Sequence, residues 1–418
     1  MASAFAGAIF LVKVCNTMLV YDILILPYVF EFRLLYMRRI AMKKSIYSII
    51  CIFLGFAAVF GNVAAINIEF CDAYRANVYG YISDILGKLT SSIPICIGEV
   101  FMLIFFLLLI IFVLQLFLFI VLKNKTGYRM IFFFYSKMMI LLCVISVFVY
   151  TYTWSIPFRG SVVKVVGAVD KDYKLGEVVN VRAHIVKKIN ELSYKVPRDE
   201  KGKVIYDNKK SRSELVYSMK KLGEQYPLLK GYYPHMKKAM ISDILEWMDI
   251  GGYTYPYTME VTYNKYSTDL YYPFLFAHES SHHQGYYKEN EANFLAFLAC
   301  INSDDVLANY SGYIEIYYYL NDAVLEKVSN NKEMLDYLKT HDLILEQVKV
   351  DINDAIKQSE ELYNNDNHPA QKLSESAQKA SKVGWDVQDE VLKEDNYDGV
   401  VKMVLDYYDV NYDLDSGF

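Results

Sequence analysis

The chain has 418 residues, of which 54% are apolar and 16% aromatic, and its formal net charge is −5. A soluble domain of ordinary composition is about 45–50% apolar, and the excess here lies in the first third of the chain, which indicates membrane spans rather than an enlarged core. The mild charge, without a basic stripe or a glycine-rich phosphate loop, argues against a nucleic-acid partner.

Residues 1–41 form an apolar N-terminal segment that Lys13, Asp22 and Pro27 interrupt. This segment could be a fourth span, a signal-like sequence, or the product of an incorrectly chosen start site. We favour the last interpretation, because Met42 and two lysines precede the next apolar run in the manner of a natural N-terminus.

A membrane domain is expected over residues 42–157, because it contains three apolar stretches that each reach the roughly 20 helical residues needed to cross a bilayer. The stretches are residues 46–66, 95–122 and 134–156. Lysine and arginine concentrate before the first stretch and between the second and third, whereas the link between the first and second carries only Arg75 and Lys88. The positive-inside rule therefore predicts that residues 158–418 are extracytoplasmic. Glu99 is expected to be an acid at the start of the second helix.

The segment after residue 158 is long and polar enough for one globular domain, predicted to be mainly helical (α+β) with a small sheet. Three stretches are strand candidates. Residues 161–168 and 176–184 are valine-rich runs, of which the second could instead open a helix. Residues 251–264 are rich in tyrosine and read as a turn followed by an edge strand. Pro256 excludes the last of these from a central position in a sheet. The helix candidates are residues 213–230, residues 235–249, most of the chain from Pro273 onward, and a final helix at 397–409.

The globular segment contains an HExxH motif, formed by His278, Glu279 and His282. Histidines at i and i+4 project from the same face of a helix, so both can bind one metal ion. Glu279 is offset by one position and can take a proton from a water that the metal activates, because zinc lowers the pKa of such a water to about 7. Pro273 suits the first turn of this helix and Gly285 can end it. The alternative is an exposed, charged helix with incidental histidines.

A hydrolytic zinc site needs a third protein ligand and one open position. Glu289 and Glu291 on the next helical stretch are the candidates, and they point in different directions. We favour Glu289 because Asn293, at i+4, could hydrogen-bond a ligating histidine, whereas Leu295 stands at i+4 from Glu291. Glu291 remains the alternative ligand.

Other side chains are weaker candidates for the site. The strand around 258–263 could pair with an extended peptide through backbone hydrogen bonds, and its Glu260 could contact the substrate or an oxyanion. Tyr310 or Tyr313 could donate a hydroxyl to a developing oxyanion, although most of the 38 tyrosines are expected to pack. His283 is expected at the surface, because it points about 100° away from the preceding histidine.

These motifs together resemble a bacterial family of integral membrane proteins called domain of unknown function 3810. The resemblance covers nearly the whole chain after Met42. The membrane part resembles the family at 93–99 and the globular part at 252–260. The match is most specific where the run 278–285 is joined to the run 289–296, and weaker matches lie at 310–313 and 397–400. The family resembles zincin peptidases, so the resemblance implies a zincin-like site for Zn²⁺ in a protein of the bacterial plasma membrane.

A more distant similarity concerns the third ligand. Residues 289–293 are similar to the ExxAD element of membrane-embedded zinc peptidases, with Asn293 in place of the Asp. The first Glu of that element is the ligand, so this similarity implies Glu289. A neutral Asn orients a histidine less strongly than a carboxylate does.

The sequence therefore predicts a membrane-anchored zinc metallopeptidase that hydrolyses an unidentified polypeptide at the outer face of the membrane. Two alternatives stay open: a metal-binding sensor or receptor without turnover, and a structural membrane protein without metal. The bilayer would be a partner in each case.

Overall fold

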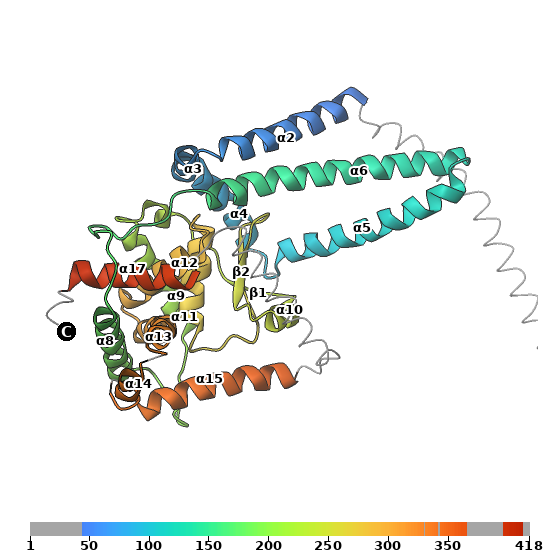
Figure 1. Cartoon of the computed structure of the whole chain (residues 1–418). Coiled ribbons are helices and arrows are strands. Elements are labelled where there is room, and N and C mark those ends of the chain that lie inside the picture. The colour runs from blue at the N-terminus through green and yellow to red at the C-terminus, as the bar shows by residue number, and fades with distance from the viewer. Residues whose placement is uncertain (1–43, 330, 342, 366–395, 413–418) are drawn as a thin grey trace, which may run out of the picture. The chain divides into compact units, whose positions relative to one another are not determined.

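Helices dominate the computed structural model of this chain, which describes residues 44–329, 331–341, 343–365 and 396–412 (Figure 1). The chain divides into two compact units, residues 1–57 and 58–418. Of the first unit the structure describes the beginning of one helix, and the features below belong to the second. The expectations for residues 1–41 lie outside the described residues.

The regular elements are mainly helices, joined by short π or 3₁₀ turns, with one small sheet. The helices are α2 (Lys44–Ala64), α3 (Ile68–Tyr74), α4 (Gly80–Ser91), α5 (Ile97–Leu122), α6 (Thr126–Tyr150), α7 (Ile156–Phe158), α8 (Leu175–Ser193), α9 (Asn208–Leu222), α10 (Ser242–Trp247), α11 (Tyr272–His283), α12 (Glu289–Ile301), α13 (Val306–Val328), α14 (Lys332–Leu338), α15 (Glu346–Asn365) and α17 (Asn396–Asn411). The strands are β1 (Lys237–Lys238), β2 (Gly252–Tyr255) and β3 (Glu260–Tyr263).

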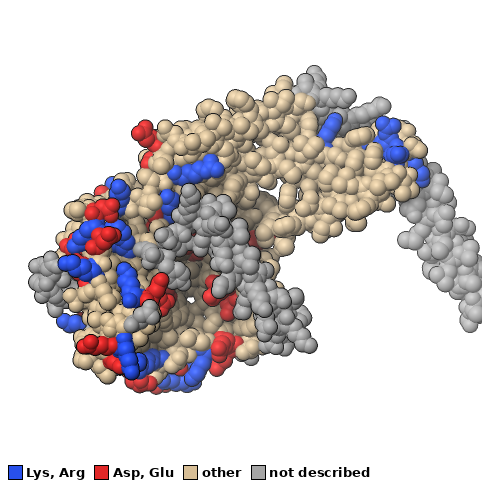
Figure 2. Space-filling view, in the orientation of Figure 1, with Lys and Arg blue, Asp and Glu red and all other residues tan. Residues whose placement is uncertain are grey.

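Three helical stretches are long and apolar enough to cross a membrane: Ile46–Ala64, Ile97–Leu122 and Thr126–Phe158. They match the predicted spans, except that the third begins before residue 134. Its first turns are helical but polar, so hydropathy alone did not include them. α5 and α6 pack as a hairpin, in which Tyr135 donates its hydroxyl to the main-chain oxygen of Leu108 at 2.7 Å. Figure 2 shows a largely uncharged surface over the long helices, whereas charged atoms gather over the helical domain.

The link between α2 and α5 shares a core with the C-terminal domain. The buried cluster that joins them consists of Ala65, Cys71, Tyr74, Tyr79, Ile156, Met259 and Tyr287. The hydroxyl of Tyr79 lies 3.0 Å from the hydroxyl of Tyr287 and donates to the main-chain oxygen of His283 at 3.0 Å. Residues on both sides of the predicted boundary at 157–158 therefore pack together in one core. The link between α2 and α5 and the C-terminal domain lie at the same end of the α5–α6 hairpin.

Two buried carboxylates join the start of α5 to the C-terminal domain. Glu260 accepts hydrogen bonds from the main-chain amides of Ile97 and Gly98, at 2.9 and 2.7 Å. These amides have no partner within the helix, so the carboxylate satisfies them. Glu99 lies in the first turn of α5, as predicted, and accepts from the main-chain amide of Met240 at 2.7 Å. The membrane hairpin is therefore fixed to the sheet region at its first turn.

The helical domain is built around α12, which is buried on every side from Glu291 to Cys300. From Phe294 to Cys300 its sequence is apolar or small all round, which is the pattern of a helix enclosed in a core rather than one with a solvent face. α9, α11, α13 and α17 surround it (Figure 1). α17 confirms the predicted final helix at 397–409.

The sheet has the order β1-β3-β2. β2 and β3 are antiparallel, with Gly252 opposite Tyr263, and β1 runs parallel to β3. The predicted edge strand at 258–263 is therefore the central strand, and the edges are β1 and β2. Pro256 lies in the reversal between them, where the chain doubles back through Met259 at φ 54°, so the proline constrains the turn and not the strand.

Two further sequence predictions, for residues 161–168 and 235–249, were wrong. Residues 161–168 form no strand, because the main-chain amide of Val163 donates to a side chain, Glu291, instead of a neighbouring strand. Residues 176–184 lie in α8, the alternative considered for them, and bury a helical stripe that includes Val178, Val181 and Ile185. Residues 235–249 contain β1 and the short α10 rather than one helix.

Candidate metal centre

α11 carries the HExxH motif and has well-defined ends. Pro273 occupies its first turn, as predicted, where a missing amide hydrogen costs nothing. At the other end the amide of Gly285 donates to the carbonyl of His282 at 2.9 Å, and that of Tyr286 donates to the carbonyl of Ser281 at 3.0 Å. This is a Schellman ending with Gly285 at φ 103°. It turns the chain back so that the carbonyl of Tyr286 reaches the motif.

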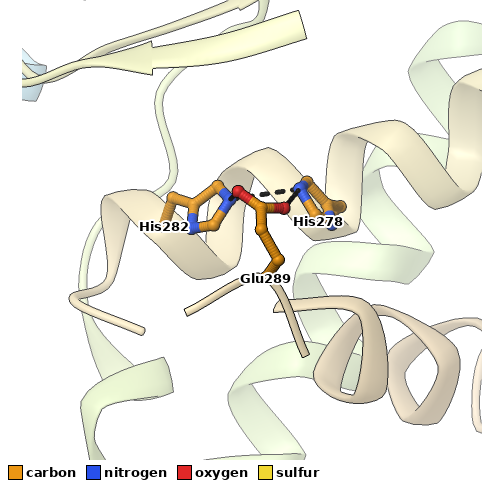
Figure 3. A group of neighbouring side chains, drawn as sticks. All are labelled: His278, His282 and Glu289. Carbon is orange, nitrogen blue, oxygen red and sulfur yellow. Dashed lines mark hydrogen bonds and ion pairs between the residues drawn. The ribbon is translucent and has the colours of Figure 1, made fainter. Parts of the chain in front are cut away.

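Three side chains converge beside α11: His278, His282 and Glu289, the first residue of α12 (Figure 3). The two Nε2 atoms are 3.1 Å apart. The carboxylate of Glu289 reaches between the rings, with one oxygen 3.2 Å from Nε2 of His278 and the other 3.5 Å from Nε2 of His282. Among the described residues, no second group of His, Cys and acidic side chains is arranged in this way.

The far side of each imidazole is held by an oxygen acceptor. Nδ1 of His278 lies 2.8 Å from Oδ1 of Asn293, and Nδ1 of His282 lies 2.9 Å from the carbonyl oxygen of Tyr286. Tyr319 accepts a hydrogen bond from Nδ2 of Asn293 at 3.0 Å, which fixes the orientation of that amide. An oxygen acceptor requires a hydrogen on each Nδ1, so each Nε2 is left with its lone pair.

This arrangement fits a divalent cation. Two nitrogen lone pairs and a carboxylate directed at one space repel each other unless positive charge lies between them. Ligands about 2.0–2.1 Å from a tetrahedral zinc are separated by roughly 3.3 Å, close to the 3.1, 3.2 and 3.5 Å observed. The Glu289 side chain is 37% exposed, so the group is open to approach from solvent.

The electrostatics of the group also favour positive charge. Burial lowers the pKa of His282, but the carboxylates of Glu289 and Glu279 and the hydrogen bond to the Tyr286 carbonyl together outweigh burial and raise the pKa to about 9. Burial raises the pKa of Glu289, and the two histidines outweigh it and hold that pKa well below its usual range. Without a cation, this group therefore binds a proton in its place.

Glu279 lies on the same helix and is held by β2. The hydroxyl of Thr254 lies 2.8 Å from the main-chain oxygen and 3.2 Å from a carboxylate oxygen of Glu279. Gly252 leaves room for this side chain, because a Cβ at that position would lie 3.3 Å from Oε1 of Glu279 and only 2.4 Å from the main-chain oxygen of Thr262. Burial raises the pKa of Glu279, and the two histidines act against this rise.

The structure brings Glu289 to the histidines and not Glu291. Glu291 is fully buried and accepts a hydrogen bond from the main-chain amide of Val163 at 2.7 Å. The short turn after α11 puts the first residue of α12 next to the motif, and the residue two positions later points into the protein. Glu291 thus holds the irregular segment that follows α7.

The three weaker site candidates lie elsewhere. The hydroxyl of Tyr310 donates to Asp351 at 2.8 Å, and the ring of Tyr313 packs edge-on against Phe297. Both therefore take the packing role that is usual for a tyrosine. The carboxylate of Glu260 is used at the start of α5, so it is not directed at the metal-binding group.

His283 is fully buried, so the expectation of a surface position was wrong. Its Nδ1 lies 3.0 Å from the carbonyl oxygen of Met259. α4 covers the ring, and a Cβ at Gly87 would lie 2.8 Å from its Cε1 atom. Burial lowers the pKa of His283 to about 4, so this ring is a neutral core residue.

Three residues near the site were not identified from the sequence: Thr254, Tyr319 and Glu315. Thr254 and Tyr319 support Glu279 and Asn293 from distant parts of the chain. Burial raises the pKa of Glu315 to about 7, and the nearby His278 opposes this rise. The one available signal was the i, i+4 spacing of Glu315 and Tyr319, which puts both on one face of α13.

Comparison with known proteins gives one match. A family model described as "Protein of unknown function (DUF3810)" matches residues 74–385, which include the HExxH motif, Glu289 and Asn293. No curated protein and no solved structure matches the chain.

Proposed function

This chain belongs to the DUF3810 family of proteins of unknown function, and we propose that it is a zinc-dependent metallopeptidase with a zincin-like site. The observation that carries the proposal is the convergence of His278, His282 and Glu289, whose donor atoms all lie within 4.8 Å of one another. Two imidazoles and one carboxylate are a common ligand set for catalytic zinc, in which a fourth position stays open.

The roles follow from the contacts. His278 and His282 would hold zinc through Nε2, and Glu289 would complete the set. Asn293 and the carbonyl of Tyr286 fix the two rings in the tautomer that leaves Nε2 free, which raises the affinity of a preformed site. Bound zinc would polarise a substrate carbonyl and make a water acidic enough to react near neutral pH.

Glu279 is the proposed general base. Its carboxylate would take one proton from the attacking water as the new C–O bond forms, and would give that proton to the leaving nitrogen as the C–N bond breaks. One peptide bond and one water thus become a carboxylic acid and an amine. Thr254 holds the carboxylate beside the motif, because its hydroxyl is 3.2 Å from Oε2 of Glu279.

An extended peptide could lie along β2, one of the two edge strands of the described sheet. Edge strands present unpaired amides and carbonyls that pair with an added strand. Thr254 on β2 contacts Glu279 directly, so a peptide on this edge would pass close to the proposed base.

The membrane helices support a location in the bacterial plasma membrane, with the C-terminal domain on the extracytoplasmic side. Lys123 and Lys125 lie in the link between α5 and α6, and Arg129 lies in the first turn of α6, all at the end of the hairpin away from the domain. Positive charge at a link favours the cytoplasmic side. The substrate would then be a polypeptide that reaches the outer membrane surface.

The test uses the full chain purified in detergent. We expect about one zinc per chain in the parent and in Glu279→Gln, and none in His282→Ala. With a mixture of internally quenched peptides, the parent should hydrolyse and Glu279→Gln should lose at least roughly 10²-fold in rate, the scale of a general base. Glu291→Gln, a buried glutamate that contacts Val163, is the matched control and should keep both zinc and hydrolysis.

Other outcomes would favour the alternatives. Zinc in the parent with equal rates in the parent and Glu279→Gln would favour a metal-binding sensor or receptor. A parent chain that binds no zinc, even when dialysed against it, would favour a structural membrane protein and would end the proposal.

A further inference from the structure

α4 carries an exposed apolar stripe that no described part of the chain covers. The stripe starts just before the helix and consists of Val78, Tyr81, Ile85 and Leu89, whose side chains are 43%, 73%, 59% and 66% exposed. Their spacing of three, four and four residues puts them on one face of a helix. Scattered apolar side chains are normal at a protein surface, but a continuous stripe indicates a binding surface.

The other faces of α4 are occupied. Gly87 packs under the ring of His283, and Asp84 accepts a hydrogen bond from the main-chain amide of Tyr232 at 2.7 Å. Lys88 reaches Asp84 at 3.2 Å and lies over the ring of Tyr232. The charged side chains of α4 are therefore turned towards the C-terminal domain, and the stripe itself carries no charge.

The position of α4 in the chain identifies what covers the stripe. α2 ends at Ala64 and α5 begins at Ile97, and both are of membrane-spanning length and composition. A link between two consecutive spans has both ends at the same face of the bilayer. Exposed apolar residues continue from the stripe towards both spans: Ile66, Ile68, Ile93 and Ile95, at 79%, 56%, 38% and 51% exposure.

We infer that α4 lies in the plane of the outer surface of the plasma membrane, with Tyr81, Ile85 and Leu89 inserted among the lipids. The face of α4 opposite the stripe, with Ser83, Gly87 and Thr90, is buried in the protein. An uncharged apolar helix face that is held at the interface by its two ends enters about 5–10 Å into the boundary between headgroups and acyl chains. The occupant is the lipid bilayer itself, and not a second copy of the chain.

This placement has a consequence for α11. Tyr79, immediately before α4, donates its hydroxyl to the main-chain oxygen of His283, and Gly87 supports the ring of the same residue. The helix at the lipid surface is therefore in direct contact with the helix that carries the HExxH motif. It sets the depth at which that motif stands above the membrane.

The experiment measures the depth of single probes. In a full chain whose six cysteines are replaced by alanine, we would introduce Tyr81→Cys, Ile85→Cys or Leu89→Cys and attach the fluorophore bimane. The control is Tyr194→Cys, because Tyr194 is 74% exposed, as Tyr81 is, but lies at the end of α8. Each chain is placed in nanodiscs of phosphatidylethanolamine and phosphatidylglycerol, with or without bromine on the acyl chains.

We expect the three α4 probes to be quenched severalfold by brominated lipid and to be shielded severalfold from aqueous iodide, relative to Tyr194. Probes on α4 that iodide quenches as strongly as it quenches Tyr194 would overturn the inference. Probes that are shielded from iodide but not quenched by brominated lipid would also overturn it, because a second copy of the chain would then cover the stripe. Three separate variants are used so that the test still stands if one of them does not fold. The readout needs no activity, so it fails independently of the zinc proposal.

Discussion

The amide oxygen of Asn293 lies 2.8 Å from Nδ1 of His278, and its amide nitrogen donates to Tyr319 at 3.0 Å. Asn293 thus sets the tautomer and angle of a proposed ligand without touching the metal. We expect Asn293→Ala to weaken zinc binding about 10–100-fold, the usual effect of losing such a partner, when zinc is titrated against a chelator. Asn302→Ala, at the end of the same helix, should leave the affinity unchanged, and equal affinities in both variants would contradict this role.

The two glutamates at the start of α12 should differ in their effect on zinc binding. Glu289→Gln removes the charged oxygen between the two imidazoles, so we expect zinc to be lost from the purified chain. Glu291→Gln keeps an oxygen that can accept from Val163, so zinc content should remain that of the parent. Metal analysis of the two variants side by side checks this, and the reverse pattern would identify Glu291 as the ligand.

Gly285 should tolerate no other residue well, because of its backbone conformation. Alanine at φ 103° is strained, and its Cβ would lie 2.9 Å from the ring of Tyr79. We expect Gly285→Ala to lower the free energy of unfolding by about 1–2 kcal/mol or more in denaturant titrations of the full chain. Gly176→Ala, in the first turn of α8 with no atom near the new Cβ, should instead raise it by about 0.5 kcal/mol.

The ion pair between Lys237 and Glu260 is buried, with side-chain exposures of 5% and 0%. Removing the negative charge by Glu260→Gln leaves the ammonium without a counter-charge, so we expect a loss of about 3–5 kcal/mol in the free energy of unfolding. The double variant with Lys237→Met should be more stable than Glu260→Gln alone. Asp336→Asn, which breaks an exposed pair with Lys339, should cost less than about 0.5 kcal/mol.

His184 should make stability depend on pH. Its ring packs against Tyr408 and Tyr412, and burial lowers its pKa from 6.5 to about 4. The unfolded chain takes up this proton first, so the contribution is present above pH 6.5 and is lost as the pH falls towards 4. We expect a loss on the order of 1 kcal/mol over this range. Thermal unfolding of His184→Gln should show a smaller pH dependence than the parent, and identical profiles would contradict the assignment.

The sequence predicted the elements whose signals are local. Hydropathy located the three long apolar helices, because crossing a bilayer requires a continuous run of apolar residues. The helical period placed His278 and His282 on one face, and the partner at i+4 favoured Glu289 over Glu291. Pro273 and Gly285 marked the ends of α11 because their backbone requirements are specific.

The remaining features depend on contacts that are distant in sequence. Nothing near Glu260 indicates that its carboxylate meets the amides of Ile97 and Gly98, more than 160 positions earlier. His283 has a polar side chain, and only the packing of α4 makes it a core residue. β3 became central because β1 pairs with it in parallel, a pairing that two lysines do not suggest.

The shared core between the link 65–98 and the C-terminal domain determines how the protein can be divided. A fragment that begins near residue 160 would lack Tyr79, which covers the end of α11, and the first turn of α5, whose amides bind Glu260 and whose Glu99 binds the amide of Met240. Glu99 would be gone and Glu260 would face water beside a lysine that has lost its other acceptors. We therefore expect the helical domain to fold only together with the link 65–98, and a fragment that begins near residue 160 to expose buried polar groups and to aggregate.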